Sequence, residues 1–204
     1  MILLTAAATA FLLSCAPTVG VQTMAGLIEH ESGWHEFAIN DNTEHRAYFP
    51  SSYFAAIYLA RGLLRRGDNI DAGLAQINSA NWPAYGLTPY TVFEPCSNVR
   101  VGANILSNNY REAEHLYPSG DPALTHALSM YHSGRPDAAL SYAERVITNA
   151  RAVRYLGVGP APSPPKGVAQ RVLPVRAAPT PHPHANPGPD VLRWALPVRD
   201  EGAP

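Results

Sequence analysis

The sequence predicts a mainly α-helical domain at residues 1–154, followed by a proline-rich tail at residues 155–204. In the first part, apolar residues recur at intervals of three and four, which is the spacing of a helix face that packs against a core. Twelve of the twenty prolines lie in the second part, where they rule out a helix or a central strand. We therefore expect this tail to be extended or disordered.

Five segments of the first part carry the signals of helices. Segment 51–67 begins with two serines and ends with a glycine, the residues preferred at the two ends of a helix. The apolar residues 1–14 fit either a first helix of the folded domain or the apolar part of an export signal. We favour the helix, because export signals begin with positive charges that this segment lacks. The expected helices span residues 23–31, 51–67, 98–117, 121–134 and 136–156.

Composition limits the classes of partner but does not decide the state of the two cysteines. A net charge of −1 and a charged fraction of 15% argue against nucleic acid, because phosphate binding needs a basic excess. No apolar run reaches the eighteen or so residues of a spanning helix. Cys15 and Cys96 fit a disulfide in an oxidising compartment, lipid attachment at Cys15, or two unrelated buried thiols.

Glu31 stands where a helix would place a core residue. Met24, Leu27 and Ile28 mark one face of the helix expected at residues 23–31, and Glu31 follows on the same face, whereas Glu29 points away. A carboxyl group on an apolar face has a raised pKa, and while still protonated it can act as a general acid. The alternative is a helix end that simply opens to water.

Residues 69–97 form a long segment that is too rich in Gly, Pro and Asn to be regular. A loop of this length in a small domain usually carries function. Gln76 and Asn78 offer amide groups that suit hydroxyl- and acetamido-rich ligands. Further along, Tyr131 ends an expected helix just before a Ser-Gly pair. Each also has a structural interpretation, since amides can satisfy loop backbone and Tyr131 can be a core residue with a bonded hydroxyl.

Taken in order and spacing, five motifs resemble the lytic transglycosylases that accompany type IV secretion systems, a branch of the goose-type lysozyme and soluble lytic transglycosylase group. The similarity covers roughly residues 14–150 and rests on CAPTV, ESGWHEFAIN, NIDAGLAQIN, FEPCSNVRVGANIL and ALSMYHSG. It implies a lysozyme-like helical domain with a long active-site loop that cuts the sugar strands of peptidoglycan. It also implies a periplasmic location. The tail fits a partner-binding or a cleavable extension, and the family context suggests contact with secretion-system components.

The resemblance assigns roles to individual residues. It implies that Glu31 is the catalytic acid, and it places Ser32, Gln76, Asn78 and Tyr131 in the substrate-binding groove. It further implies that Cys15 and Cys96 form a disulfide. Two departures from the family pattern are Ala75, where the family commonly has Met, and His132, where it often has Asn; a role for His132 is therefore not transferred.

The expected mechanism needs no metal and no cofactor. His30, His35 and His45 lack the paired spacing and third ligand of a zinc site. The resemblance implies that the substrate's own acetamido group replaces a second carboxylate and that the product is a 1,6-anhydro sugar. Asp41, Asp71 and Glu36 are the candidate second acids, but none stands at a motif position that the family uses for catalysis. The alternatives are a hydrolytic lysozyme and a non-catalytic wall-binding assembly factor.

Overall fold

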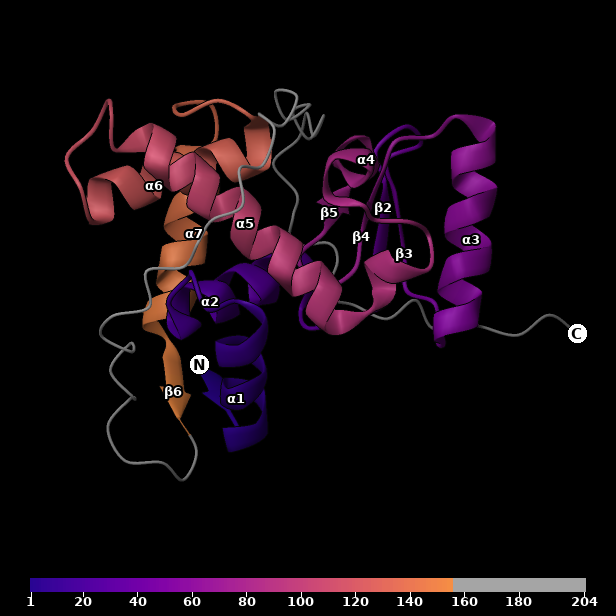
Figure 1. Cartoon of the computed structure of the whole chain (residues 1–204), viewed down its shortest axis with the longest axis horizontal. Helices are drawn as coiled ribbons and strands as arrows, with labels where there is room; N and C mark the ends of the chain where they lie inside the picture. The colour runs from indigo at the N-terminus through magenta and orange to yellow at the C-terminus, as the bar shows by residue number, and fades with distance from the viewer. Residues whose placement is uncertain (156–204) are drawn as a thin grey trace, which may run out of the picture.

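The computed structural model describes residues 1–155, in which seven α-helices are combined with a two-stranded and a four-stranded sheet (Figure 1). The predicted tail, apart from Tyr155, lies outside the described residues. The helices are α1 Ala6–Cys15, α2 Val21–Ser32, α3 Tyr53–Arg66, α4 Trp82–Tyr85, α5 Pro95–Ala113, α6 Asp121–Ser133 and α7 Leu140–Arg151. The strands are β1 Ile2–Leu4, β2 Ile39–Asp41, β3 Arg46–Tyr48, β4 Ile70–Ala72, β5 Ile77–Asn78 and β6 Val153–Tyr155. The predicted mainly α fold is confirmed.

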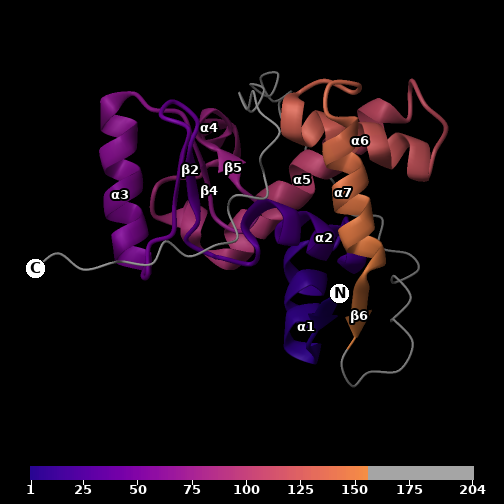
Figure 2. The ribbon, with the colours of Figure 1, turned by 180° about the vertical axis from the view of Figure 1, so that it is seen from behind.

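Helix α5 runs through the middle of the molecule. It contacts α1 and α6 on the helical side, and β5 and the short 3₁₀ helix Thr91–Phe93 on the other side. Helices α1, α2, α6 and α7 gather at one end, whereas the four strands β2 to β5 and α3 form the other end, as the view from behind also shows (Figure 2). Leu27, Ile28, Leu106 and Leu128 are fully buried where the helices meet.

The strands form two sheets. The larger has the order β3-β2-β4-β5 with antiparallel neighbours, in which Ile39 pairs with Ala72 and Asp71 pairs with Asn78. The smaller joins β1 to β6 in parallel, with Ile2 opposite Val153. The expectation that residues 69–97 are irregular was wrong in part, since this segment contains β4, β5 and α4. Strands of two or three residues are too short for an alternating pattern to reveal them.

Two helix boundaries test the signals read from the sequence. Helix α3 begins after Ser52, whose hydroxyl accepts from the Ala55 amide, and ends at Gly67 in the left-handed conformation, as predicted. Helix α7 begins at Leu140 and not near residue 136. The hydroxyl of Ser129 accounts for the difference, because it donates to the Arg135 carbonyl and accepts from the Ala139 amide, which holds this connection out of the helix.

The predicted disulfide between Cys15 and Cys96 is confirmed, and it ties the end of α1 to the start of α5. The bridge closes a loop with a sequence separation of 81 residues. In the chain-entropy model, a loop of this length stabilises the folded state by about 4 kcal/mol. Residues 6–15 form a helix as expected, and no helix among residues 1–155 is long and apolar enough to cross a bilayer.

Gly26 allows α2 to lie very close to α7. A Cβ atom at this position would lie 2.6 Å from the Ala150 nitrogen and 2.8 Å from the Val146 carbonyl oxygen. Only a glycine fits against the backbone at such a distance. The close approach joins the middle of α2 to the C-terminal half of α7.

We predict opposite effects on stability for two glycine substitutions within helices. Gly26→Ala forces α2 and α7 apart and should lower the free energy of unfolding by about 1–3 kcal/mol. Gly62→Ala should raise it by about 0.5–1 kcal/mol, because a Cβ there meets nothing within 4 Å and alanine favours helix. Urea unfolding of both variants checks the pair, and equal effects would contradict the proposed packing.

Candidate active site

Glu31 lies in the last turn of α2, and its side chain is half-buried. Met24, Leu27 and Ile28 on the same face are buried, as the apolar spacing predicted. The helix ends at Gly33 with a φ of 57°, and Trp34 follows with a φ of 68°. These two consecutive left-handed residues turn the chain away from the axis of α2, so the helix ends within two residues of Glu31.

Tyr142 of α7 is the direct partner of this carboxyl group, since its hydroxyl donates a hydrogen bond to Oε1 of Glu31. Burial raises the pKa of Tyr142 well above its usual value, and the neighbouring Glu31 charge raises it further. The phenol is therefore a permanent donor at neutral pH. Its ring is held from two sides, by an edge contact with His30 at 4.8 Å between ring centroids and by a stack on His132 at 4.4 Å.

Residues 73–76 form a turn that lies beside the end of α2. The Ser32 hydroxyl donates to the Leu74 carbonyl at 2.8 Å, and the Tyr131 hydroxyl donates to the Ala75 carbonyl at 2.7 Å. Burial, followed by the Glu31 charge, raises the pKa of Tyr131, so this hydroxyl also keeps its proton. The turn is thus fixed to α2 on one side and to α6 on the other.

Asn98 of α5 also supports this turn through hydrogen bonds. Its side chain is fully buried; Oδ1 accepts from the Ala75 amide at 2.7 Å, and Nδ2 donates to the Ala72 carbonyl at 2.8 Å. Gly73 has a φ of 81°, and a Cβ on it would lie 2.3 Å from the Asn98 amide nitrogen. The glycine of the loop motif is therefore needed both for its conformation and for the close approach of Asn98.

The two loop amides predicted to bind substrate point inward. Gln76 is buried with a φ of 45°, and its amide nitrogen Nε2 donates hydrogen bonds to the carbonyls of Ala38 and Gly73. Its Oε1 atom is buried and has no hydrogen-bond partner among the described residues. Asn78 is buried and uses both ends of its amide, with Asn69, Asp71 and the Ala80 amide as partners. Contact of either with a saccharide stays a prediction.

Two of the candidate second acids, Asp41 and Asp71, are hydrogen-bonded within the four-stranded sheet and its turns. Asp41 is buried, and its Oδ1 accepts from the amides of Thr43 and Glu44. Asp71 is buried and accepts from the side chains of Asn42 and Asn78. Both carboxylates therefore hold the sheet and its turns together. Within residues 1–155, no group of three or more His, Cys, Asp or Glu side chains is placed to hold a metal ion.

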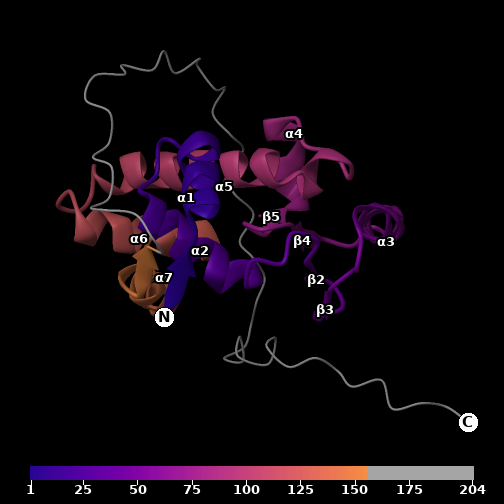
Figure 3. The same cartoon turned by 90° about the horizontal axis from the view of Figure 1, so that it is seen from below.

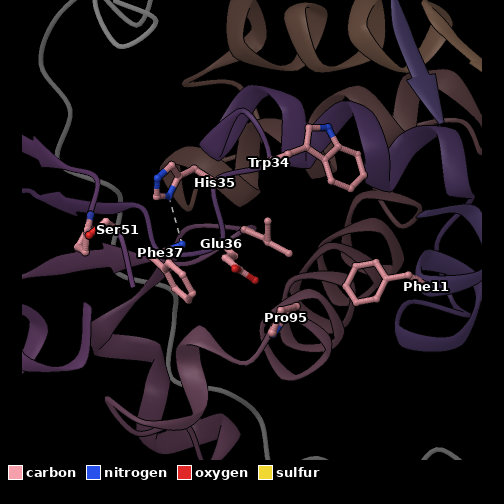
Figure 4. Close-up of a pocket in the computed structure, with 9 residues that line it drawn as sticks. Phe11, Trp34, His35, Glu36, Phe37, Ser51 and Pro95 are labelled. Carbon is pink, nitrogen blue, oxygen red and sulfur yellow. Dashed lines mark hydrogen bonds between the residues drawn. The ribbon is translucent and has the colours of Figure 1, made fainter. Parts of the chain in front are cut away.

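Glu36 lines a separate pocket of about 460 Å³, whose lining does not include Glu31 (Figure 4). The Glu36 carboxyl group points into this pocket, between Phe37 on one side and Phe11 and Trp34 on the other. Leu74 also lines it. One side of the turn at residues 73–76 thus lines this pocket, whereas the neighbouring Ala75 carbonyl accepts a hydrogen bond from the buried Tyr131.

Sequence reasoning missed two residues that shape this site, Tyr142 and Asn98. Each is a polar side chain on the apolar face of a helix. Tyr142 precedes buried Ala143 and Val146, and Asn98 stands at helical spacing before Gly102 and Ile105. The same signal singled out Glu31. It could have identified both residues, although not the partner of either.

Comparison with known proteins identifies the family. The transglycosylase SLT domain family matches residues 10–146, so the chain belongs to this family. The resemblance inferred from the motifs is thereby confirmed.

Among curated proteins, the chain is similar to the type IV secretion system protein virB1 of Brucella suis biovar 1. The two are 36% identical over 144 residues, which is 67% of this chain and 60% of the relative. It is also similar to the protein virB1 of Agrobacterium tumefaciens strain 15955, at 32% identity over 141 residues, or 68% of this chain and 59% of the relative. The chain thus spans about three-fifths of the length of these relatives. No solved structure gives a significant match.

We predict that His30 makes the stability of the protein depend on pH. Burial and the Arg145 charge lower the pKa of His30 from 6.5 to about 4. Between these values the unfolded chain binds a proton that the folded chain does not, so stability is full above pH 6.5 and falls as the pH drops towards 4. The slope from one such proton is at most about 1.4 kcal/mol per pH unit.

The variant His30→Gln should show a shallower loss of stability over this pH range than the wild type in urea unfolding. His115→Gln, at an exposed position, serves as the matched control and should leave the slope unchanged. An unaltered slope in His30→Gln would contradict the assignment.

Proposed function

We propose that this protein is a peptidoglycan lytic transglycosylase in which Glu31 acts first as the acid and then as the base. The observation that carries the proposal is the hydrogen bond from the Tyr142 hydroxyl to the Glu31 carboxyl group at the end of α2, in a chain of the transglycosylase SLT family. The proposed target is the β-1,4 bond between N-acetylmuramic acid and N-acetylglucosamine.

In the first step, the protonated Glu31 carboxyl group donates to the glycosidic oxygen while the bond to C1 of the muramic acid breaks. Two features support the protonated form. The side chain is half-buried, which penalises its charge, and it lies in the last turn of α2, where the helix carbonyls carry partial negative charge. The Tyr142 hydroxyl orients the carboxyl group and stabilises the carboxylate that forms.

In the second step, the Glu31 carboxylate takes the proton from the 6-hydroxyl of the muramic acid, and the 6-oxygen bonds to C1. The product is a 1,6-anhydro sugar, and no water is consumed. Asp41 and Asp71 are engaged in the sheet, and Glu36 faces another pocket, so the positive charge at C1 needs another source of stabilisation. We assign this role to the acetamido oxygen of the substrate itself.

The turn at residues 73–76 is the proposed floor of the groove beside Glu31. Its backbone is fixed by Ser32, Tyr131 and Asn98, so we assign these side chains to positioning the turn. Gln76 combines a positive φ with a buried oxygen that lacks a hydrogen-bond partner among residues 1–155, and both features are common at functional sites. We propose that its amide turns to meet the acetamido or hydroxyl groups of the glycan.

The relatives' names supply the proposed setting. Since they are called type IV secretion system protein virB1 or protein virB1, we propose that this chain opens the cell wall locally where such a system assembles. The disulfide suits an oxidising compartment such as the periplasm. The tail at residues 155–204 is the proposed contact with other components of the system.

Replacing the acid separates the proposed enzyme from a wall-binding protein without turnover. Glu31→Gln keeps the shape of the side chain but cannot donate a proton, so release of soluble muropeptides from purified sacculi should fall by about three orders of magnitude or more. Glu29→Gln on the same helix is the matched control and should keep full activity. Mass spectrometry of the products should find anhydro ends, whereas reducing ends would assign a hydrolytic lysozyme instead.

A second variant tests the role of the α7 tyrosine. Tyr142→Phe removes one hydrogen bond to a charged group, worth about 1.5–3 kcal/mol, and should lower kcat roughly 10- to 100-fold with little change in KM. The phenyl ring keeps the contacts with His30 and His132, so the fold should be retained. Tyr110→Phe on α5 is the control. A wild-type kcat in Tyr142→Phe would remove this residue from the mechanism.

A further inference from the structure

The outer face of α3 carries a row of aromatic and arginine side chains that we name the α3 stripe: Phe54, Tyr58, Arg61 and Arg65. Phe54 and Tyr58 are 80% and 79% exposed, and both arginines are exposed as well. The four positions follow one another at intervals of four, three and four residues, so they line one side of the helix. The stripe therefore forms a continuous surface.

Folding does not require this surface. The opposite face of α3 already supplies the buried residues, namely Ala56, Ile57, Ala60 and Leu63. Single exposed apolar residues are ordinary on protein surfaces, but two large aromatic side chains one turn apart beside two guanidinium groups have the composition of a binding surface.

Part of the stripe is held in position. The Arg61 guanidinium lies over the Tyr90 ring at 5.8 Å and donates a hydrogen bond to the Tyr90 hydroxyl at 3.1 Å. The Tyr53 hydroxyl donates to the Tyr90 carbonyl, which fixes this tyrosine in turn. Such restraint lowers the entropy that a surface side chain loses on binding.

Gly62 leaves the helix backbone bare within this surface. It lies four residues after Tyr58, and a Cβ at this position would meet nothing within 4 Å. Neither packing nor a special backbone angle calls for a glycine here, and glycine weakens a helix. A bare stretch of this kind lets a flat, extended ligand lie close to the helix.

The charge of α3 indicates an anionic ligand. The helix contains three arginines and no acidic residue, although the whole chain has a net charge of −1. Arg66 is paired with Asp68 at 2.5 Å, which leaves Arg61 and Arg65 to supply the positive charge of the stripe. Guanidinium groups bind carboxylates through paired hydrogen bonds.

We propose that the α3 stripe binds a second strand of peptidoglycan, separate from the strand at Glu31; this inference rests on the proposed function. Flat aromatic rings offer the apolar faces on which sugar rings pack, and the arginines match the carboxylates of the lactyl and peptide groups. From residue 54 to residue 65, the helix rises about 16 Å, which is long enough to follow several sugar units of an extended strand.

The position of α3 fits such a role. The helix lies at the edge of the molecule, and β2, β3 and β4 stand between it and α2, as seen from below (Figure 3). A ligand on the stripe therefore leaves the end of α2 accessible. Two linked contacts with one polymer network keep the protein on the wall between cuts, because the second contact is effectively intramolecular.

Binding without turnover tests the proposal. In the full chain carrying Glu31→Gln, co-sedimentation with purified sacculi should weaken by about tenfold or more for Phe54→Ala/Tyr58→Ala and for Arg61→Gln/Arg65→Gln. Leu116→Ala/Arg111→Gln removes an exposed apolar residue and an arginine elsewhere, and should bind as the parent does. Circular dichroism of each variant checks that it is folded. Unchanged binding in both stripe variants would overturn the proposal.

Two further measurements assign the ligand. With Glu31 restored, the stripe variants should digest sacculi more slowly but cut short soluble glycan chains at the wild-type rate. If the wild type cuts nothing while the stripe variants still lose sacculus binding, the proposed function fails and the wall-binding surface stands. If the variants lose binding to phosphatidylglycerol vesicles but keep their affinity for sacculi, the stripe is a lipid surface and the proposal is overturned.

Discussion

The contact of α2 with α7 at Gly26 is the constraint on which the rest of the site depends. The backbones meet so closely that a single Cβ would collide with the Ala150 nitrogen. With this distance fixed, the last turn of α2 and the first half of α7 lie side by side, and the Tyr142 hydroxyl reaches the Glu31 carboxyl group. The Glu31 carboxyl group and its donor Tyr142 are thus brought together although they lie more than a hundred residues apart in the sequence.

A second close approach orders the other half of the site. Gly102 of α5 admits Ala75 and the Tyr131 hydroxyl, since a Cβ there would lie 2.7 Å from the Ala75 Cβ. Asn98, one turn earlier on the same helix, bonds the Ala75 amide. Helix α5 therefore holds the turn at residues 73–76 as α7 holds Glu31. Small residues where helices meet set the distances between the helices. Buried polar side chains then form hydrogen bonds across these distances.

Features that depend on residues close together in the sequence could be predicted from it. Glu31 on an apolar face, the ends of α3 at Ser52 and Gly67, and the family motifs all follow from short-range patterns. Features that depend on tertiary contacts were not predictable in this way. The partnership of Tyr142 with Glu31 requires the distance between two helices, and β4 and β5 exist only because they pair with each other and with β2. The late start of α7 depends on a serine of α6.

The disulfide between α1 and α5 makes one structural restraint depend on the redox conditions around the protein. It encloses α2, the sheet and the turn beside the acid within one covalent ring. In a reducing environment this ring is open, and the helix that carries Asn98 loses its covalent link to the first helix. Oxidation therefore adds a covalent restraint around Glu31 and its neighbouring turn, and this restraint lasts only in surroundings in which thiols do not persist.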